Sequence, residues 1–327
     1  MYEVYDRWPE ISNTNFNSGI QPLNTEKISH IVFAGMGGSG ALSDIFAAIL
    51  SKTNVHVDVV KGYSLPKTVN SETLVITTSI SGNTIETLTV LNSARKMNCK
   101  ILGFSSGGHM EEICLKNNLE YRKIAMENSP RASFAGFLYS MLRVLENILP
   151  LKKEDVDDSI LKISKLRNRI SSDNLNEKND SLELAKWITN FPMIYYPWGL
   201  QAAAIRFKNS LQENAKIHSA AEDIIETCHN GIVAWNNNSS VMPILIQGKD
   251  DFVKTKERWK IVKEFFEDQN IEYKEIISEE GNILTKIISL IYLFDYTSIY
   301  HAVINKIDPT PVNAIDFIKN KTKIKNF

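Results

Sequence analysis

Short apolar stretches rich in β-branched residues alternate along the chain with longer stretches in which apolar residues recur every three or four positions. The short stretches are typical of buried strands and the long ones of amphipathic helices, and their alternation is typical of parallel βα units. In the N-terminal half this pattern predicts strands over residues 31–34, 55–60, 74–78, 101–104 and 119–124. It predicts a turn over residues 35–40 and helices over residues 41–50, 84–97 and 132–149.

A polar segment divides the chain into two such sets of units. Residues 151–180 are rich in Asp, Lys, Glu and Asn, which predicts a connecting helix and surface loops rather than core. Beyond it the pattern predicts strands over residues 193–196, 242–247 and 271–277, and helices over residues 200–211, 253–269 and 283–306. Because 327 residues fit two domains better than one, we expect two α/β domains, over residues 1–150 and 151–327.

Composition and charge exclude several partners. The chain has 37 basic and 38 acidic residues, a net charge of -1, and nucleic acid is therefore not expected as a partner. The longest apolar run, over residues 287–294, is too short to span a bilayer. The N-terminus lacks the pattern of a secretory signal. Three cysteines without C-x-x-C spacing predict neither a metal site nor disulfides, and a cytoplasmic protein is expected.

A glycine-rich loop, Gly35-Met-Gly-Gly-Ser-Gly40, lies between the first predicted strand and its helix. Glycines let the backbone approach a ligand, and the N–H groups at a helix N-terminus attract anions. The loop also satisfies G-x-G-x-x-G, and Asp58 lies in the second strand, near the place of a ribose-binding acid. A nicotinamide-binding loop and a purely structural turn therefore remain alternatives.

A second loop, Thr77-Thr-Ser-Ile-Ser-Gly-Asn-Thr84, joins the third strand to the next helix. Hydroxyls at Ser79, Ser81 and Thr84, together with helix N-terminal amides, can coordinate the oxygens of one phosphate. The alternative is that Ser81 or Thr84 caps the helix. Because parallel strands end at a common edge, we expect this loop to converge with Ser39.

Both loops resemble those of the sugar isomerase (SIS) domain, which has a flavodoxin-like parallel sheet and a Ser/Thr loop that holds a sugar phosphate. The resemblance implies that the chain contains two such domains. It also implies a set of substrate-binding residues: Gly37, Gly38, Ser39, Ser79, Ser81 and Thr84.

Glu213 and His229 are the candidates for acid–base chemistry, 16 residues apart in the second half. Aldose–ketose isomerisation needs a base that carries a proton between C1 and C2, and an acid that opens the sugar ring. A carboxylate and an imidazole in one partly desolvated pocket suit these roles. Alternatively, Glu213 is an exposed carboxylate at a helix end and His229 an N-terminal helix residue.

Five ordered motifs extend the resemblance over nearly the whole chain. They are the two loops, Pro130-Arg-Ala132, Leu211-Gln-Glu-Asn-Ala-Lys216 and His229-Asn230, and Asp308-Pro-Thr-Pro-Val312 also fits. Their order resembles the bifunctional phosphoglucose/phosphomannose isomerases of archaea and bacteria. The resemblance implies a hexose 6-phosphate substrate, no metal or other cofactor, and a homodimer.

Roles for individual residues follow from the same resemblance. It implies that Glu213 is the catalytic base and that His229, supplied by the partner subunit, opens the ring. Arg131 would stabilise the enediolate, although it could also be a plain helix N-terminal residue. Thr310 and Lys319 would complete the site, with a turn hydroxyl and a solvated basic tail (Lys321, Lys323, Lys325) as the alternatives.

One departure from the family pattern lies beside His229. Gly231 stands where the family has glutamate, and the preceding Ile225-Glu-Thr-Cys228 lacks a proline, so the preference between glucose and mannose 6-phosphate stays open. Two further functions remain as alternatives. One is a non-catalytic sugar-phosphate-binding protein, and the other is a nicotinamide-dependent oxidoreductase.

Overall fold

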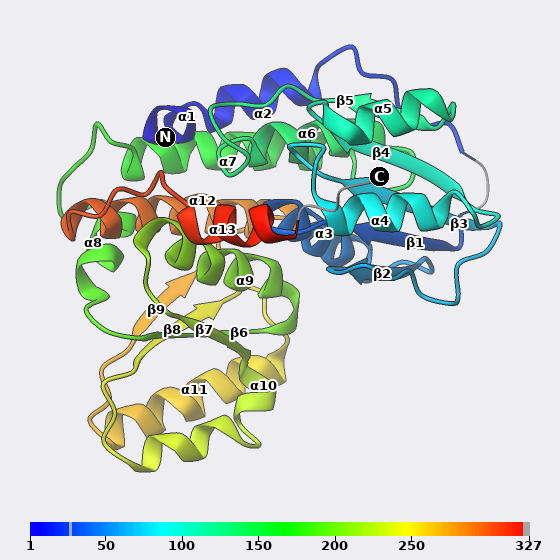
Figure 1. The fold of residues 1–327 in the computed structure, drawn as a ribbon. Coiled ribbons are helices and arrows are strands. Elements are labelled where there is room, and N and C mark those ends of the chain that lie inside the picture. Colours follow the sequence, from blue (N-terminus) through cyan, green and yellow to red (C-terminus); the bar gives the residue numbers. More distant parts are fainter. Residues whose placement is uncertain (26–27, 323–327) are drawn as a thin grey trace.

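The computed structural model describes residues 1–25 and 28–322, and Figure 1 shows its arrangement. In the N-terminal half a parallel sheet has the strand order β2-β1-β3-β4-β5, the flavodoxin-like order. Its strands are β1 (His30–Ala34), β2 (His56–Val60), β3 (Thr73–Thr78), β4 (Lys100–Ser105) and β5 (Glu120–Lys123). All five strands predicted from the sequence are confirmed to within a few residues.

The C-terminal half has a second parallel sheet with the order β7-β6-β8-β9, the same arrangement with one strand fewer. Its strands are β6 (Pro192–Tyr196), β7 (Ala220–Asp223), β8 (Met242–Gln247) and β9 (Lys274–Ile277). The expected α/β architecture with two parallel sheets is therefore confirmed. Strand β7 was not predicted, and β9 begins three residues later than expected.

Helices of the N-terminal half are α3 (Gly37–Leu50), α4 (Ile85–Ala94), α5 (Gly108–Lys116) and α6 (Phe134–Val144). Helix α3 begins at Gly37, so the expectation that residues 35–40 form only a turn was wrong. Gly37 has φ +54°, which a glycine adopts without strain, and the helix can therefore begin directly after the strand. Helix α5 was not predicted.

The segment over residues 151–180 contributes to the core, contrary to the expectation of surface structure alone. It forms α7 (Lys153–Ile170), whose buried residues Val156, Ile163 and Leu166 share one face. The charged residues that dominate its composition lie on the other face. Two unpredicted N-terminal helices, α1 (Tyr2–Asp6) and α2 (Trp8–Phe16), lie beside it, and α2 packs against α6 and α7.

Helix α12 connects the two halves. The C-terminal helices are α8 (Asp180–Trp187), α9 (Gln201–Ser210), α10 (Ile224–Thr227), α11 (Val253–Asp268), α12 (Ile283–Ile304) and α13 (Asn313–Lys321). Helix α12 packs against α7, α8, α9 and α3, and Figure 1 shows it crossing between the two lobes. It is long and apolar enough to span a membrane, but 89% of its most apolar stretch is buried inside the protein. Its apolar composition is that of a core helix.

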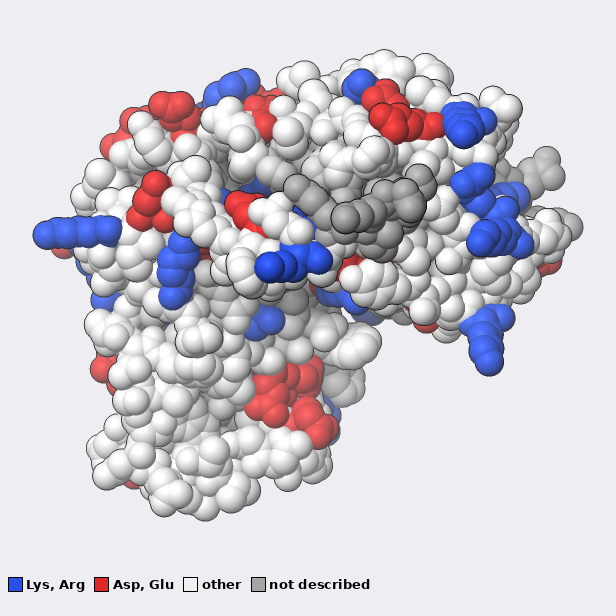
Figure 2. Space-filling model, in the orientation of Figure 1, with Lys and Arg blue, Asp and Glu red and all other residues white. Residues whose placement is uncertain are grey.

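Charged side chains are mixed over the face drawn in Figure 2. Lys and Arg are spread over it, and a group of acidic side chains lies on the lower, C-terminal lobe. Among the residues that the structure describes, this face carries no continuous basic stripe of the kind that follows a nucleic-acid backbone.

Candidate active site

Glu213 lies on a π-helical turn, Leu211–Ala215, that continues α9 and ends at Lys216 in the left-handed conformation (φ 58°). Such wide turns occur frequently at functional sites because they displace a side chain from the regular helical position. Helix α12 holds this turn at two points. The Ser210 hydroxyl donates to the Asp295 carboxylate over 2.6 Å, and the Asn214 amide donates to the Ser298 hydroxyl over 2.9 Å.

Arg131, which precedes α6, joins this turn to the C-terminal segment. Its Nε lies 3.4 Å from the Glu213 carboxylate, and its Nη1 donates to the Asn214 side chain over 2.6 Å. The same guanidinium donates to the carbonyls of Pro309 (3.0 Å) and Thr310 (2.8 Å). The side chain of Arg131 is 14% exposed and that of Glu213 is 32% exposed. The carboxylate is therefore accessible to a ligand while a fixed positive charge lies beside it.

Lys216 adds a second cation to this neighbourhood. Its ammonium donates to the Pro311 carbonyl over 2.7 Å, which fixes the 309–311 segment over the turn. Burial, and secondly the nearby Arg131, lower the pKa of Lys216 below its ordinary value. The sequence analysis included Lys216 in a motif but predicted no role for it. A lysine at the end of that motif, two residues after Asn214, could have indicated a second cation at the site.

Arg206 and Asp295 form a buried ion pair that sequence reasoning missed. Arg206 Nη2 lies 2.6 Å from the carboxylate, and the guanidinium stacks 3.9 Å above the Phe134 ring. Burial alone would lower the pKa of Arg206, but the Asp295 charge outweighs it and holds that pKa above its ordinary value. The signal in the sequence was an arginine on the apolar face of a predicted helix, and an aspartate directly after an apolar run.

Glu213, Arg131 and Arg206 line one cavity of about 320 Å³ between the two halves of the chain, whereas Lys216 and Asp295 do not. Its wall includes Tyr5, Gly37, Gly38, Arg131, Arg206 and Glu213. Burial raises the pKa of Tyr5 above its ordinary value. The glycines belong to the first turn of α3, where unpaired N–H groups and the positive end of the helix dipole attract an anion. An anion-binding helix end and a carboxylate paired with arginine thus face the same space.

The hydroxyl loop, which carries Ser79, Ser81 and Thr84, follows β3. The glycine loop follows β1, the neighbour of β3 in the sheet. Strands β1 and β3 are neighbours, and β2 lies on the other side of β1, so the chain reverses direction across the sheet between them. Loops at such a switch point are where open α/β sheets bind ligands. None of Ser79, Ser81 and Thr84 is among the residues that line the cavity.

The helix-capping alternative for this loop is not observed. The N-cap of α4 is Thr84, and its side chain makes no capping hydrogen bond. Instead the Ser79 hydroxyl donates to the Thr84 hydroxyl over 2.9 Å. Gly82 is required for the turn, because a Cβ there would lie 1.7 Å from the Gly107 carbonyl oxygen. Ser79 and Thr84 are thus bonded to each other, whereas the Ser81 hydroxyl accepts the Asn83 N–H over 3.3 Å.

The remaining candidate residues do not line the cavity. Ser39 is buried in the first turn of α3, and Thr310 meets Arg131 through its carbonyl rather than its hydroxyl. His229 is exposed beyond α10, and Lys319 is exposed on α13. Neither lines the cavity of its own chain. Lys323 and Lys325 of the expected basic tail lie outside the described residues.

Gly231, which departs from the family pattern, lies close to the side chain of Glu222. A Cβ at this position would lie 2.7 Å from a carboxylate oxygen of Glu222 in β7. The loop that carries His229 therefore packs directly against a glutamate from the adjacent strand, and any larger residue at position 231 displaces that side chain.

Comparison with known proteins identifies both halves of the chain. Residues 25–145 match the SIS domain, and residues 177–322 match the bacterial phospho-glucose isomerase C-terminal SIS domain. A bifunctional phosphoglucose/phosphomannose isomerase of Caldicellulosiruptor bescii is 32% identical over 91% of both chains. A D-glucosamine-6-phosphate 4-epimerase of Sulfolobus acidocaldarius is 28% identical, over 75% of this chain and 77% of its own.

The fold also matches solved structures. A glucosamine-6-phosphate deaminase from Thermotoga maritima superposes with a TM-score of 0.68 over 94% of this chain and 95% of its own, at 16% identity. At that identity the likeness concerns the fold alone, which has two SIS domains.

Proposed function

The chain belongs to the family of bifunctional phosphoglucose/phosphomannose isomerases, and from this premise we propose that it interconverts glucose 6-phosphate and mannose 6-phosphate with fructose 6-phosphate. The observation that carries the proposal is the contact of Glu213 with Arg131, 3.4 Å apart, in a cavity that also contains the N-terminus of α3. A base, a cation and an anion site in one cavity are the groups that this reaction needs.

In the proposed mechanism Glu213 removes the proton from C2 of the open-chain aldose. The electrons pass toward the C1 carbonyl and form a cis-enediol, and Glu213 then returns the proton to C1. The hydroxyl proton on O2 passes to O1, so a ketone remains at C2 and no oxidant or other reactant is consumed. Glucose and mannose 6-phosphates differ only in configuration at C2. Removal of that proton gives both the same enediol, so one base serves both substrates.

Arg131 stabilises the intermediate in this mechanism. The guanidinium is held by Asn214 and by the Pro309 and Thr310 carbonyls, and its orientation is therefore set before substrate binds. A preorganised positive charge beside the developing enediolate lowers the barrier more than one that must move into place. The α3 N-terminus and the hydroxyls of Ser79, Ser81 and Thr84 would hold the phosphate, as the family resemblance implies.

The exposed position of His229 fits a role across a subunit boundary. Within its own chain it does not line the Glu213 cavity, so a ring-opening role requires a second copy of the chain. We therefore retain a homodimer, a division into domains near residue 150 and a metal-free reaction as parts of the proposal. A cytoplasmic location fits the three free thiols Cys99, Cys114 and Cys228.

The alternatives have less support. A protein that only binds sugar phosphates has no need of a carboxylate held against Arg131. A nicotinamide-binding protein would use Asp58 for a ribose, but His30 and His56 already engage that carboxylate. The similarity to a D-glucosamine-6-phosphate 4-epimerase names a distinct reaction on a related substrate, and the experiment must separate it.

The test is to incubate the purified full chain with each of glucose 6-phosphate, mannose 6-phosphate and D-glucosamine 6-phosphate, and to identify the products by NMR. We expect fructose 6-phosphate from the first two and no C4 epimer from the third. No added metal or nucleotide should be needed. A chain that epimerises only the hexosamine phosphate, or that binds all three without turnover, contradicts the proposal.

A further inference from the structure

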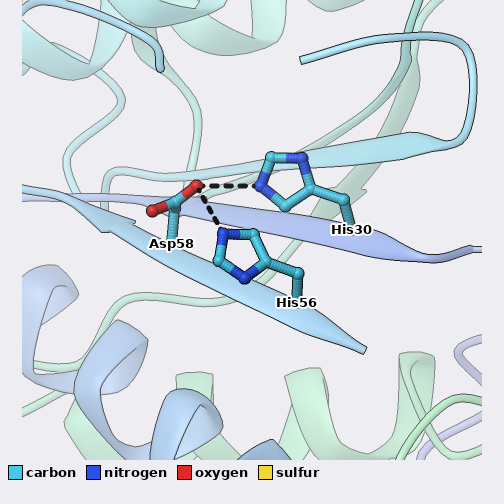
Figure 3. Close-up of side chains that lie close together, drawn as sticks. All are labelled: His30, His56 and Asp58. Carbon is cyan, nitrogen blue, oxygen red and sulfur yellow. Dashed lines mark hydrogen bonds and ion pairs between the residues drawn. The ribbon is translucent and has the colours of Figure 1, made fainter. Parts of the chain in front are cut away.

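A group of histidine and aspartate side chains lies at the end of the N-terminal sheet opposite the phosphate loops. Within residues 1–25 and 28–322, His30, His56 and Asp58 are the one group of this kind, with one ligand atom of each within 4.8 Å of the others. His30 in β1 stands opposite His56 in the parallel strand β2, so both point to the same face. Asp58 follows two residues later on that face. Figure 3 shows both rings turned toward this carboxylate.

The two imidazoles approach a single oxygen. His30 Nε2 lies 2.9 Å and His56 Nε2 3.4 Å from Asp58 Oδ2. The side chain of His30 is 7% exposed, whereas those of His56 and Asp58 are 65% and 35% exposed. The group is thus fixed on its inner side by His30 and open to solvent on its outer side, so an ion can enter.

A hydrogen bond behind His30 engages its Nδ1 and leaves Nε2 toward Asp58. Thr73 in β3 stands opposite His30, and its hydroxyl lies 3.1 Å from His30 Nδ1. The hydroxyl also accepts the Asn70 N–H (2.9 Å) and lies 3.4 Å from the Asn70 side-chain oxygen. When Thr73 donates to Asn70, it accepts from Nδ1–H, and the lone pair of Nε2 then faces a carboxylate oxygen. In this tautomer a cation between the two acceptors binds both, whereas in the other tautomer Nε2–H donates to Asp58 over 2.9 Å.

We propose that His30, His56 and Asp58 form a binding site for a divalent transition-metal ion, with Zn²⁺ as its representative. Two imidazoles and a carboxylate are ligands that zinc prefers, at about 2.0–2.2 Å, and tetrahedral geometry separates two such atoms by about 3.3 Å. The observed separations of 2.9 and 3.4 Å require only small shifts. The bond from Nδ1 to Thr73 orients His30 as second-shell bonds orient metal-ligating histidines.

The ion would act on stability rather than on catalysis. His30 is the first residue of β1, and the glycine loop follows the last, about 13 Å away at the 3.3 Å rise of a parallel strand. Strand β2 is an edge strand that pairs only with β1 in this sheet. A metal ion held by one ligand from β1 and two from β2 would therefore stabilise the pairing of the edge strand β2 with β1. The proposal does not depend on the reaction proposed above.

The first test uses the full chain after treatment with a chelator. Titration with ZnCl₂ in a calorimeter should give one ion per chain, and Co²⁺ should give the absorption bands of a tetrahedral site. Free Zn²⁺ at 100-fold above the dissociation constant should raise the melting temperature by about 4 °C. His56→Ala should abolish all three effects. It should leave the metal-free melting temperature nearly unchanged, because His56 is mostly exposed.

His109→Ala is the matched control. His109 is equally exposed and lies 3.0 Å from Glu112, but that pair supplies only two ligands. We expect this variant to bind zinc as the parent does, and His56→Ala to turn over substrate at the parental rate. Absence of stoichiometric binding in the parent, or binding unchanged in His56→Ala, would overturn the proposal. His30, His56 and Asp58 would then be a hydrogen-bonded ion cluster only.

Discussion

The guanidinium of Arg206 and the carboxylate of Asp295 lie 2.6 Å apart at a depth where neither side chain is more than 5% exposed. This pair connects α9 to α12 just before the turn that carries Glu213. Asp295 also accepts the hydroxyl of Ser210, the residue directly before that turn. The position of Glu213 therefore depends on a charge pair that holds the residue before its turn and does not contact Glu213 itself.

Asp295→Asn should destabilise the protein strongly, because it leaves the Arg206 charge buried without a counter-charge. Breaking a buried pair in this way costs about 3–5 kcal/mol, which for 327 residues lowers the melting temperature by roughly 4–7 °C. Thermal unfolding followed by circular dichroism measures the effect. The double variant Arg206→Met with Asp295→Leu should recover most of the loss, since it removes both charges.

Glu257→Gln provides the control for this experiment. Glu257 pairs with Lys254 over 2.8 Å, but both side chains are more than half exposed. Solvent screening limits such pairs to about 1 kcal/mol or less, so this variant should keep the parental melting temperature. Equal effects in the two single variants would show that the Arg206–Asp295 pair has no special role.

The hydroxyl loop after β3 allows a separate prediction about the affinity for sugar phosphates. Ser81→Ala or Thr84→Ala should raise the KM for sugar phosphates by about 10- to 150-fold. Each removes a hydrogen bond to a charged group, worth about 1.5–3 kcal/mol. Steady-state kinetics measures the change. Ser93→Ala is the matched control, because this α4 hydroxyl only donates to the Thr89 carbonyl. Parental KM values in both loop variants would remove the loop from the site.

Sequence patterns predicted the strands that are rich in β-branched or other apolar residues, whether central or at the edge of a sheet. β1 and β3 are buried along their whole length and form continuous apolar runs. The edge strand β7, Ala-Ala-Glu-Asp, is only half-buried and takes its conformation from pairing with β6. Nothing in its residues favours a strand. In the 151–180 segment a connecting helix was predicted, but the polar composition concealed its buried face, because apolar periodicity rather than average polarity determines burial.

The candidate site was predictable in its parts but not in its contacts. The chemistry of the glycine loop and of Glu213 could be read from residue type and neighbouring elements. Arg131 and Glu213 are 82 residues apart, and only the packing of the two halves across α12 brings them together. Arg206 and Asp295 were missed because each is a single charge within an apolar stretch. The sequence around such a residue shows that its charge is unusual there, but it does not show which residue forms an ion pair with it.

Stability should depend on pH through His301. Burial lowers the pKa of His301 below its ordinary value, while its Nε2 interacts with the Ile188 carbonyl over 3.0 Å. The unfolded chain therefore binds a proton that the folded chain does not, and stability falls as pH decreases through about 6.5. His301→Gln should flatten this dependence in denaturant unfolding between pH 5 and 7. The exposed His218→Gln should retain the parental slope.

The subunit arrangement can be tested with two inactive variants. Glu213→Gln removes the base from one chain, and His229→Ala removes the ring-opening residue from another. If His229 acts across the subunit boundary, a hybrid dimer contains one site with both residues intact. Mixing the two proteins under conditions of subunit exchange should then restore up to a quarter of parental activity per chain, given half of the dimers as hybrids. Failure to recover activity after exchange is verified would place both residues in one chain.

Glu213→Gln alone tests the central step of the proposed reaction. The substitution keeps the size of the side chain and its hydrogen-bonding ability but removes the base. Substrate binding should survive, because the helix terminus and hydroxyl loop are untouched. The kcat should fall by about 10²–10⁴-fold, the usual contribution of a positioned general base. A loss confined to kcat is the signature of an interaction made in the transition state.

Solvent exchange of the C2 proton, followed by NMR in D₂O, measures the enediol step independently of product formation and should be lost in parallel. Gln201→Ala changes an exposed residue at the start of α9 that does not line the cavity and is the control, with exchange expected near the parental rate. If Glu213→Gln exchanges the C2 proton as fast as the parent, another group carries the proton and Glu213 only binds Arg131.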